Sequence, residues 1–523
     1  MGALEKKVFW LLAITLIFAA GLRIANITKK GLWVYDEAYY SLEAKTLYSA
    51  CSWVIDNRAQ IFSGTASFGS LKTYLRETGC IFPTGVAKPF FMVSASVAAL
   101  LTGAHDYSIA LMSGFWGLGI IVAAFLLVKK IDGDKSAFLA LLLAFFSVDG
   151  LIFSRMGQSQ TMTAFLLLCA IYLAVSDKFF LSGIVLSLGF ASHYCVLFNA
   201  VFFFLWFAIF KRKYLLSFLA GFILPLFLFD GISWMEKFIL RDSLADINFY
   251  TYGQYLIRQF FNASTQTRGS FFDRDFLFVF KLLINREGII LSAASLAYLG
   301  LPLWKREKFT PGQWCLWFNG WGVLLLWVLN TGLVFSRAIF PAWTVVLAGT
   351  AIALSRIRIR YVKEALLIAA AVFFITRFYQ VVNISSGYGD AARWLKNHGQ
   401  DSVVAIHNWP LYQFYLDNKI YPNVDRVNNA ADMANFHGKG IRYLAVDPTA
   451  IYLGDKNWAF LKSIINQYEP AARIPNKFIE ASWLNYPPED NGLFPAKKGE
   501  GYIYIYDLCP LEVVGRDPCI APS

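Results

Sequence analysis

The chain is built around apolar runs of about twenty residues, a length that spans the hydrocarbon core of a bilayer as one helix. Hydrophobic residues make up 57% of its 523 residues and charged residues 16%, whereas soluble proteins carry about a quarter charged residues. The net charge of +12 does not indicate nucleic-acid binding, because most basic residues lie in short clusters between the apolar runs. Such clusters are typical of cytoplasmic loops. We therefore expect a polytopic α-helical membrane protein with no nucleic-acid partner.

The basic clusters also predict the topology. Lys6 and Lys7 place the N-terminus in the cytoplasm, and the first apolar run lacks the small-residue cleavage site of a signal peptide. The apolar stretch 89–103 is short for a span, so we interpret it as an in-plane helix within one external loop, 28–106. About eleven spans result, at 8–27, 107–128, 136–153, 161–175, 179–192, 194–210, 214–232, 288–304, 313–333, 338–354 and 363–381. This parity places the chain after Val381 outside, which predicts a multi-pass protein of the inner (plasma) membrane.

The sequence divides at Val381 into a transmembrane catalytic module, 1–381, and a small soluble extracytoplasmic domain, 382–523. In the second part, helices are predicted at 388–398, 410–417 and 458–467, and strands at 402–407, 442–447 and 502–508. This alternation favours an α/β domain with a mostly parallel sheet. It carries no Gly-rich phosphate loop and no metal-ligand spacing. We therefore interpret it as a cap over the membrane site or a partner-docking domain.

The seven cysteines divide between the two predicted compartments. Cys169, Cys195 and Cys315 fall in spans, where a thiol is usually a small apolar filler. The others form two external pairs that suit disulfides in an oxidising periplasm: Cys51 with Cys80 in the loop, and Cys509 with Cys519 in the tail.

Two adjacent carboxylates, Asp36 and Glu37, follow the first span directly. Charges so close to lipid are costly unless they are hydrated, paired or used. The same acids suit the N-terminus of a helix running to about Ser49, so a capping role stays open beside catalysis. Lys88 precedes the proline that starts the in-plane helix. Its two interpretations are snorkelling to the headgroups and gripping a lipid phosphate.

Further polar residues fall at external span ends. Arg155, Gln158 and Gln160 lie between the third and fourth spans. An external Arg is unusual under the positive-inside rule, which favours anion binding, with interfacial anchoring as the alternative. His193 and Arg337 are also predicted outside, although a lone His is more often structural than a ligand. Acids and cations beside lipid suit a reaction that deprotonates an acceptor and releases an anionic, lipid-bound leaving group.

In this order, the residues resemble the GT-C glycosyltransferases, specifically the protein O-mannosyltransferase and lipid A aminoarabinose transferase group. The match consists of an Arg ending the first span, an Asp-Glu pair in the first external loop, a Lys-Pro before an apolar helix, and a later Arg followed by a proline: Arg23, Asp36-Glu37 with Tyr39, Lys88-Pro89, and Arg337 with Pro341. The chain departs from the pattern at Phe90, where a second proline is frequent, and at Ala87, where the aminoarabinose transferases have an acid. It also has Gln158 and Gln160 where the family commonly has an acid.

The resemblance implies a GT-C fold and an inverting transfer of a hexosyl or pentosyl group from a polyprenyl-phosphate lipid donor to a lipid, glycan or protein acceptor at the outer face. Asp36, with Glu37, would be catalytic as base or acceptor orienter. Lys88, Arg337 and Arg155 would bind the donor phosphate. Further substrate contacts are expected from these residues: Tyr39, Tyr40, His193, Gln158 and Gln160. No cofactor is certain; a divalent metal ion stays open, with Glu37 and His193 as weaker candidates.

Other classes of protein predict different features. An oligosaccharide polymerase or ligase is chemically close and would differ in its acceptor. A transporter of lipid-linked glycans predicts ionisable residues in mid-span and inverted repeats, and neither is evident in the sequence. A non-catalytic scaffold would leave Asp36 and Glu37 dispensable.

Overall fold

The chain, seen as a computed structural model, divides into two compact units. The membrane unit comprises Met1–Ala25, Pro83–Ala95 and Ala110–Val382, and the C-terminal unit comprises Asn26–Phe82, Ser96–Ile109 and Asn383–Ser523. The structure describes residues 3–77, 88–240, 251–265, 277–304, 309–329, 336–357, 360–400, 403–405, 408–416, 435–436, 438–447, 464, 466, 468–480 and 501–508. The boundary expected at Val381 is one residue from the observed one, but much of the first external loop groups with the C-terminal residues.

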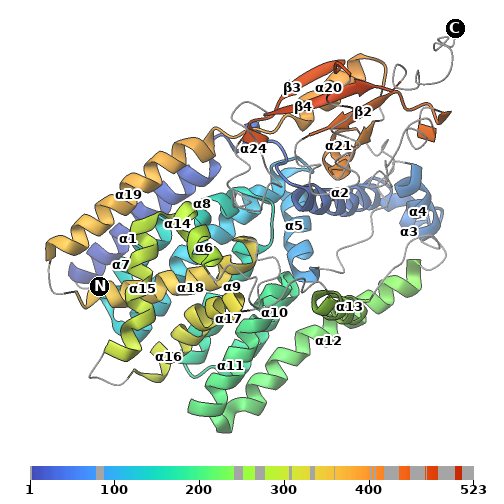
Figure 1. Cartoon of the computed structure of the whole chain (residues 1–523). Coiled ribbons are helices and arrows are strands. Elements are labelled where there is room, and N and C mark those ends of the chain that lie inside the picture. The colour runs from blue at the N-terminus through green and yellow to red at the C-terminus, as the bar shows by residue number, and fades with distance from the viewer. Residues whose placement is uncertain are drawn as a thin grey trace. The chain divides into compact units, whose positions relative to one another are not determined.

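The membrane unit consists of helices in its described part (Figure 1). They are α1 (Ala3–Ile24), α5 (Pro89–Thr102, which starts in this unit), α6 (Ser108–Asp132), α7 (Asp134–Phe145), α8 (Val148–Arg155), α9 (Gln160–Val175), α10 (Phe179–Ser192), α11 (Leu197–Phe210), α12 (Leu215–Leu240), α13 (Tyr252–Thr265), α14 (Phe278–Glu287), α15 (Ile289–Trp304), α16 (Pro311–Trp317), α17 (Val323–Leu329), α18 (Ser336–Ser355) and α19 (Arg360–Val382).

Within the described residues, five segments are long and apolar enough to cross a membrane: Trp10–Lys29, Ser108–Asp132, Arg212–Met235, Arg337–Ser355 and Tyr361–Val382. The pair α7 and α8, bent by 54°, gives a sixth if it forms one span. Shorter apolar helices cover other expected spans: Gln160–Val175, Phe179–Ser192, Tyr194–Phe210 and Ile289–Pro302. The chain is thus a multi-pass membrane protein, and the number eleven stays a prediction.

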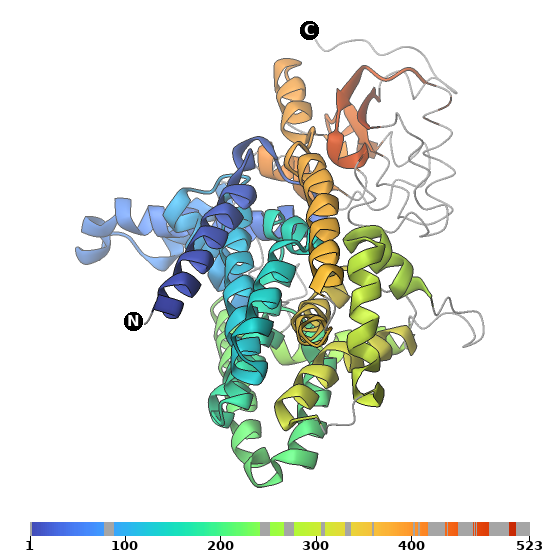
Figure 2. The same cartoon turned by 90° about the vertical axis from the view of Figure 1, so that its left-hand side faces the viewer.

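Close helix contacts organise the membrane unit, whose helices run alongside one another in Figure 2. The central helix is α18, which packs against α7, α9 and α15. Helices α10 and α12 meet at two glycines. A Cβ on Gly183 would lie 2.2 Å from the Phe218 carbonyl oxygen, and a Cβ on Gly221 would lie 2.1 Å from that of Phe180. Only glycine permits this approach of two backbones.

The C-terminal unit combines helices with a four-stranded sheet, whose strands are orange to red in Figure 2. Its helices are α2 (Tyr35–Asp56), α3 (Arg58–Phe62), α4 (Phe68–Glu77), α20 (Tyr388–Asn397), α21 (Trp409–Tyr415) and α24 (Lys477–Glu480). Its strands are β1 (Val404–Ala405), β2 (Tyr443–Val446), β3 (Ala472–Pro475) and β4 (Tyr502–Asp507). The order is β1-β2-β4-β3, with β1 and β2 parallel and the other neighbours antiparallel.

The sheet corrects one expectation. The mostly parallel arrangement predicted from the alternating pattern is wrong, because β4 pairs antiparallel with both β2 and β3. The short strand β3 was not predicted; its side chains are at most half-buried, so it lacks an apolar run. Helices α20 and α21 and strands β1, β2 and β4 lie where they were expected. Most of the helix expected at 458–467 lies outside the described residues.

Loop and tail share one hydrophobic core in the C-terminal unit. Leu32 precedes α2, and Ala38 and Leu42 lie one helical turn apart on it; all are at most 4% exposed. They belong to the same cluster as side chains from the tail: Tyr388, Leu395, Ala405, Leu411, Tyr412, Ile503 and Ile505. The loop after the first span therefore folds with the tail.

The structure describes only some of the cysteines. Cys195 and Cys315 are buried, as expected of small apolar fillers. Cys80, Cys509 and Cys519 lie outside the described residues, so both disulfides stay predictions.

Candidate functional site

The site residues predicted from the sequence form one group in each unit. Asp36, Glu37, Tyr39 and Tyr40 lie on α2 in the C-terminal unit. The membrane unit carries the cations and the polar side chains: Lys88, Arg155, Gln158, Gln160, His193 and Arg337.

Helix α2 begins with the two acids. Val34 before it is extended (φ −133°, ψ 158°) and provides no side-chain cap. Asp36 and Glu37 in the first turn therefore supply the negative charge that a helix N-terminus favours. Their environments differ, because Asp36 is half-buried while Glu37 is 0% exposed. The helix runs to Asp56, further than the sequence suggested.

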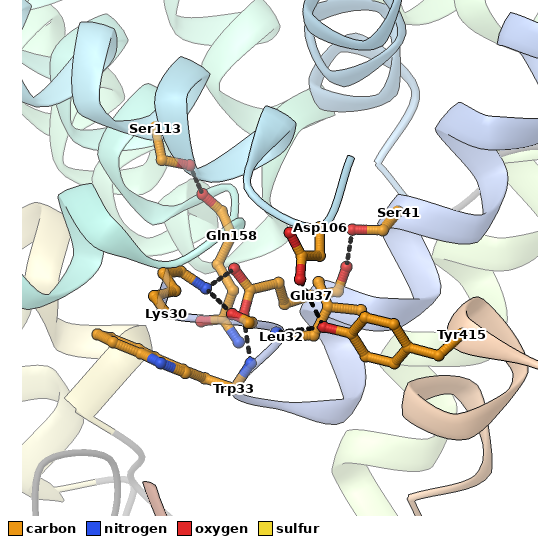
Figure 3. A network of polar contacts seen from close by, with 10 residues as sticks. Lys30, Leu32, Trp33, Glu37, Ser41, Asp106, Ser113, Gln158 and Tyr415 are labelled. Atoms are coloured by element: carbon orange, nitrogen blue, oxygen red, sulfur yellow. Dashed lines mark hydrogen bonds and ion pairs between the residues drawn. The ribbon is translucent and has the colours of Figure 1, made fainter. Parts of the chain in front are cut away.

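Glu37 closes the turn that leads into α2 (Figure 3). Its Oε1 accepts a hydrogen bond from Lys30 Nζ at 2.6 Å, and its Oε2 accepts one from the Trp33 N–H at 2.7 Å. Lys30 Nζ also donates to the Gly31 carbonyl at 2.8 Å and lies 4.6 Å from the centre of the Trp33 ring. The Lys30 and Glu37 side chains are 0% and 1% exposed. Glu37 thus has a positioning contact, and Asp36 is the more accessible carboxylate of the pair.

The two tyrosines after the acids also differ. Tyr39 is half-buried and stacks on Tyr35, with ring centres 6.3 Å apart. Tyr40 is buried and meets Tyr39 edge-on at 6.2 Å. Of the two, Tyr39 is the better placed for contact with a substrate.

Lys88, His193 and Arg337 form one electrostatic group in the membrane unit. Lys88 lies just before α5, His193 lies between α10 and α11, and Arg337 lies in the first turn of α18. The pKa of His193 is well below its usual value because the imidazole is buried, and because Lys88 and Arg337 oppose a further positive charge. His193 Nδ1 accepts the Cys195 N–H at 3.1 Å, which places the proton of the neutral ring on Nε2. A neutral N–H donor thus accompanies two cations.

Arg155, at the end of α8, is tied to the first span. Its Nη1 donates to carbonyl oxygens at the C-terminus of α1: Leu22 at 3.3 Å, Arg23 at 2.9 Å and Ala25 at 2.7 Å. A cation is favourable at that end of a helix. The side chain is fully buried, and its Nε and Nη2 have no hydrogen-bond partner among the described residues. Arg155 therefore combines a structural contact with unused donors that suit an anion.

Buried polar atoms without a partner are concentrated just after Arg155. Gln158, Ser159, Gln160 and Thr161 are each at most 3% exposed. Gln158 Oε1, both amide atoms of Gln160 and the two hydroxyls make no hydrogen bond within the described part of the chain. Ser113 Oγ fixes the backbone by donating to the Gln158 carbonyl at 3.2 Å (Figure 3). Because buried polar groups are nearly always hydrogen-bonded, this loop suits a polar ligand.

Sequence reasoning missed a buried ionic network at the bend between α7 and α8. Arg286 Nη1 lies 3.0 Å from Asp149 Oδ1. Glu287 accepts hydrogen bonds from Ser147 Oγ at 2.7 Å, the Val148 N–H at 2.9 Å and Trp343 Nε1 at 2.9 Å. Burial and the nearby Asp149 carboxylate raise the pKa of Glu287 to about 7, against the opposing effect of these donors. The network holds the bend. Its members lie too far apart in sequence for spacing to reveal them.

The two weaker metal candidates do not fit a divalent cation. Both Glu37 oxygens accept hydrogen bonds from the chain, and His193 lies near the positive charges of Lys88 and Arg337. Among the described residues, no group of three or more His, Cys, Asp or Glu side chains is arranged for a metal ion.

No protein-family model and no curated protein matches the sequence. In structure, the chain is similar to ArnT from Cupriavidus metallidurans in the apo state, with a TM-score of 0.59 and 10% identity over 90% of this chain and 97% of that one. It is also similar to the oligosaccharyltransferase from Archaeoglobus fulgidus in the apo form, with a TM-score of 0.52 and 13% identity over 85% of this chain and 70% of that one. These likenesses extend over most of both chains and agree with the resemblance that Asp36-Glu37 and Lys88-Pro89 indicated. The chain therefore shares the overall fold of these two proteins.

Proposed function

We propose that the protein transfers a sugar from a polyprenyl-phosphate donor to an acceptor hydroxyl at the outer face of the membrane. The observation that carries this proposal is the group formed by Lys88, His193 and Arg337. Two cations and a neutral N–H donor, from elements far apart in sequence, suit the phosphate of a lipid at a membrane surface. The GT-C fold and the apolar helices support the same reaction class.

The cations act on the leaving group. As the bond between the anomeric carbon and the phosphate oxygen breaks, its electron pair passes to the polyprenyl phosphate. Lys88 and Arg337 stabilise the negative charge that develops there, and His193 Nε2–H donates a hydrogen bond. The unused Nε and Nη2 of Arg155 provide a further site for a phosphate oxygen.

Residues 158–161 contact the sugar. Amide groups of Gln158 and Gln160 and hydroxyls of Ser159 and Thr161 offer neutral donors and acceptors, as sugar hydroxyls require. A sugar held by these groups satisfies polar atoms that the described chain leaves without a partner.

Asp36 serves as the general base. The acceptor oxygen attacks the anomeric carbon opposite the leaving phosphate, which inverts the configuration, and the acceptor proton passes to the Asp36 carboxylate. Glu37 keeps the α2 N-terminus in place through Lys30 and the Trp33 N–H. Tyr39 and Tyr40 contact the acceptor.

The proposal includes the sidedness of the chain. About eleven spans place the N-terminus in the cytoplasm and the C-terminal unit outside an inner (plasma) membrane. The donor then reaches the protein from the bilayer, and the acceptor is a lipid, a glycan or a protein.

The test is a transfer assay with purified full-length protein in proteoliposomes. Polyprenyl-phosphate hexoses and pentoses serve as donors, and membranes from host cells lacking the protein supply the acceptor. We expect release of polyprenyl phosphate together with glycosylated acceptor. Lys88→Ala should raise the donor KM roughly tenfold to a hundredfold, because it removes a charge-assisted contact with phosphate. The exposed Lys130, at the end of α6, is the matched control, and Lys130→Ala should leave KM unchanged.

Several outcomes would contradict the proposal. Movement of intact donor across the bilayer without release of polyprenyl phosphate would indicate a transporter. Transfer of a whole glycan chain would indicate a polymerase or ligase. Equal donor KM values for Lys88→Ala and Lys130→Ala would show that Lys88 does not bind the donor phosphate.

A further inference from the structure

We propose that the tail, 383–523, holds the Asp36 helix in its working position, and that Tyr415 is the positioning residue of this arrangement. The inference rests on the proposed role of Asp36. It assigns the tail a part in catalysis, in place of a separable cap or a partner-docking domain.

The first step of the argument is the shared core. Ala38 and Leu42, one turn apart on α2, are buried in the same cluster as Trp409 and Leu411 of α21. That cluster also contains Ile505 of β4, so the helix that carries Asp36 lies against the sheet domain. Removing the tail would expose this face of α2 to water.

The second step is the entry to α2, which the tail binds through its backbone. The Ser386 N–H donates to the Lys30 carbonyl at 2.8 Å. Gly31 has φ +65°, and a Cβ there would lie 2.4 Å from Ser386 Oγ. The positive φ favours glycine at this position, whereas the Ser386 hydroxyl could rotate away from an added Cβ. The turn that ends in the Lys30–Glu37 ion pair is thus fitted to the tail.

The third step is the Tyr415 hydroxyl, which joins separate parts of the chain (Figure 3). It accepts the Leu32 N–H at 3.2 Å and donates to Asp106 Oδ2 at 2.7 Å. Burial and the Asp106 carboxylate hold the pKa of Tyr415 well above its usual value, so the hydroxyl keeps its proton. The hydroxyl of this half-buried side chain therefore joins α21, the segment before α2 and the end of the external loop.

Aromatic contacts of two residues just before Asp36 complete the attachment. The Trp33 ring stacks on Phe478 with centres 5.8 Å apart, and the Tyr35 ring meets Trp409 edge-on at 6.0 Å. Because a general base must be placed within hydrogen-bond reach of its proton, a shift of about 1 Å can cost a hundredfold in rate. The tail contacts oppose such a shift.

The experiment compares two tyrosines of α21 in the full-length protein in proteoliposomes. Tyr415→Phe removes the hydroxyl that bridges Leu32 and Asp106. Tyr412→Phe is the matched control, because the Tyr412 hydroxyl is buried and has no hydrogen-bond partner among the described residues. We expect Tyr415→Phe to lower kcat about tenfold to a hundredfold with an unchanged donor KM, and Tyr412→Phe to change neither.

A second pair of variants distinguishes loss of the Tyr415 hydrogen bond from misfolding. Asp106→Asn keeps an acceptor for the Tyr415 hydroxyl and should retain most of kcat, while Asp106→Ala should resemble Tyr415→Phe. Hydrogen exchange measured by mass spectrometry should rise at residues 30–40 in Tyr415→Phe and stay at the wild-type level in Tyr412→Phe.

The results separate this inference from the proposed function. Normal kcat in Tyr415→Phe, beside an inactive Asp36→Asn protein, would overturn the positioning role and leave the function standing. Lower yield or thermal stability with normal kcat per folded molecule would also overturn it. Transfer by Asp36→Asn at the wild-type rate would instead refute the role of Asp36 itself.

Discussion

At the scale of single residues, Asp36 and Glu37 have different surroundings although they are neighbours in the chain. Glu37 compensates a buried ammonium group, since Lys30 is 0% exposed and lies 2.6 Å from its carboxylate. Asp36 is half-buried on the same turn. Loss of charge at Glu37 should therefore affect folding, and loss of charge at Asp36 should affect chemistry.

The first prediction concerns Asp36→Asn. The amide keeps the shape of the acid but cannot accept a proton, and it removes one negative charge from the first turn of α2. We expect transfer to fall at least about a hundredfold, while the lost charge lowers the free energy of unfolding by only about 0.3–1 kcal/mol. A helix cap without a catalytic role predicts near-normal transfer. Steady-state rates and thermal unfolding in detergent decide between the two.

The second prediction concerns Glu37→Gln, which leaves the Lys30 ammonium buried without a counter-charge. Breaking a buried ion pair on one side costs about 3 kcal/mol, so the melting temperature should drop well below that of Asp36→Asn. Replacing both partners, with Lys30→Met in the Glu37→Gln background, should restore most of that loss. Equal melting temperatures for wild type and Glu37→Gln would show that the ion pair does not stabilise the unit.

The third prediction concerns pH. Burial and the charges of Lys88 and Arg337 lower the pKa of His193. In the folded protein, the imidazole is therefore neutral at any pH above its usual pKa of about 6.5, and also at pH values somewhat below it. A neutral N–H donor at this position does not need a proton from solution. His193→Gln, which keeps a neutral donor, should therefore have the same pH dependence of transfer as wild type between about pH 6 and 8. If the wild-type transfer rate changes with pH in this range and that change is absent in His193→Gln, the reaction uses the imidazolium.

At the scale of elements, the apolar helices and most elements of the tail could be predicted, because periodicity and chain length indicate them directly. The antiparallel pairing of β4 could not, since strand direction depends on contacts between segments far apart in sequence. The same reason hid the Asp149–Arg286 pair and the Tyr415–Asp106 contact. The sequence showed Gln158 and Gln160 after Arg155, but not that their side chains are buried without a hydrogen-bond partner among the described residues, because burial depends on segments far apart in the chain.

The fourth prediction concerns the contact of α10 with α12. A Cβ on Gly221 would lie 2.1 Å from the Phe180 carbonyl oxygen, whereas a Cβ on Gly231 of the same helix meets nothing within 4 Å. Gly221→Ala should destabilise the protein by about 1–3 kcal/mol. Gly231→Ala should be neutral or slightly stabilising, because alanine favours helices more than glycine. Thermal unfolding of both variants in one detergent measures the difference, and equal effects would contradict the close approach.

At the scale of the whole molecule, the fifth prediction concerns sidedness. The positive-inside rule places Lys129 and Lys211 in the cytoplasm. The same topology places Lys396, on α20, outside the cell membrane. With the native cysteines replaced by serine, an impermeant maleimide added to intact cells should label Lys396→Cys and leave Lys129→Cys and Lys211→Cys unmodified until the membrane is opened. Labelling of Lys129→Cys from outside would reverse the topology and separate Asp36 from the outer face.

The proposed donor is tested most directly by mass spectrometry of lipids and surface glycans from cells that produce either the wild-type protein or Asp36→Asn at equal levels. The account predicts that one polyprenyl-phosphate sugar accumulates in the Asp36→Asn cells, while one glycosylated lipid, glycan or protein loses that sugar. The mass of the accumulated lipid names the sugar. Identical lipid and glycan profiles in the two strains would contradict the catalytic role of Asp36.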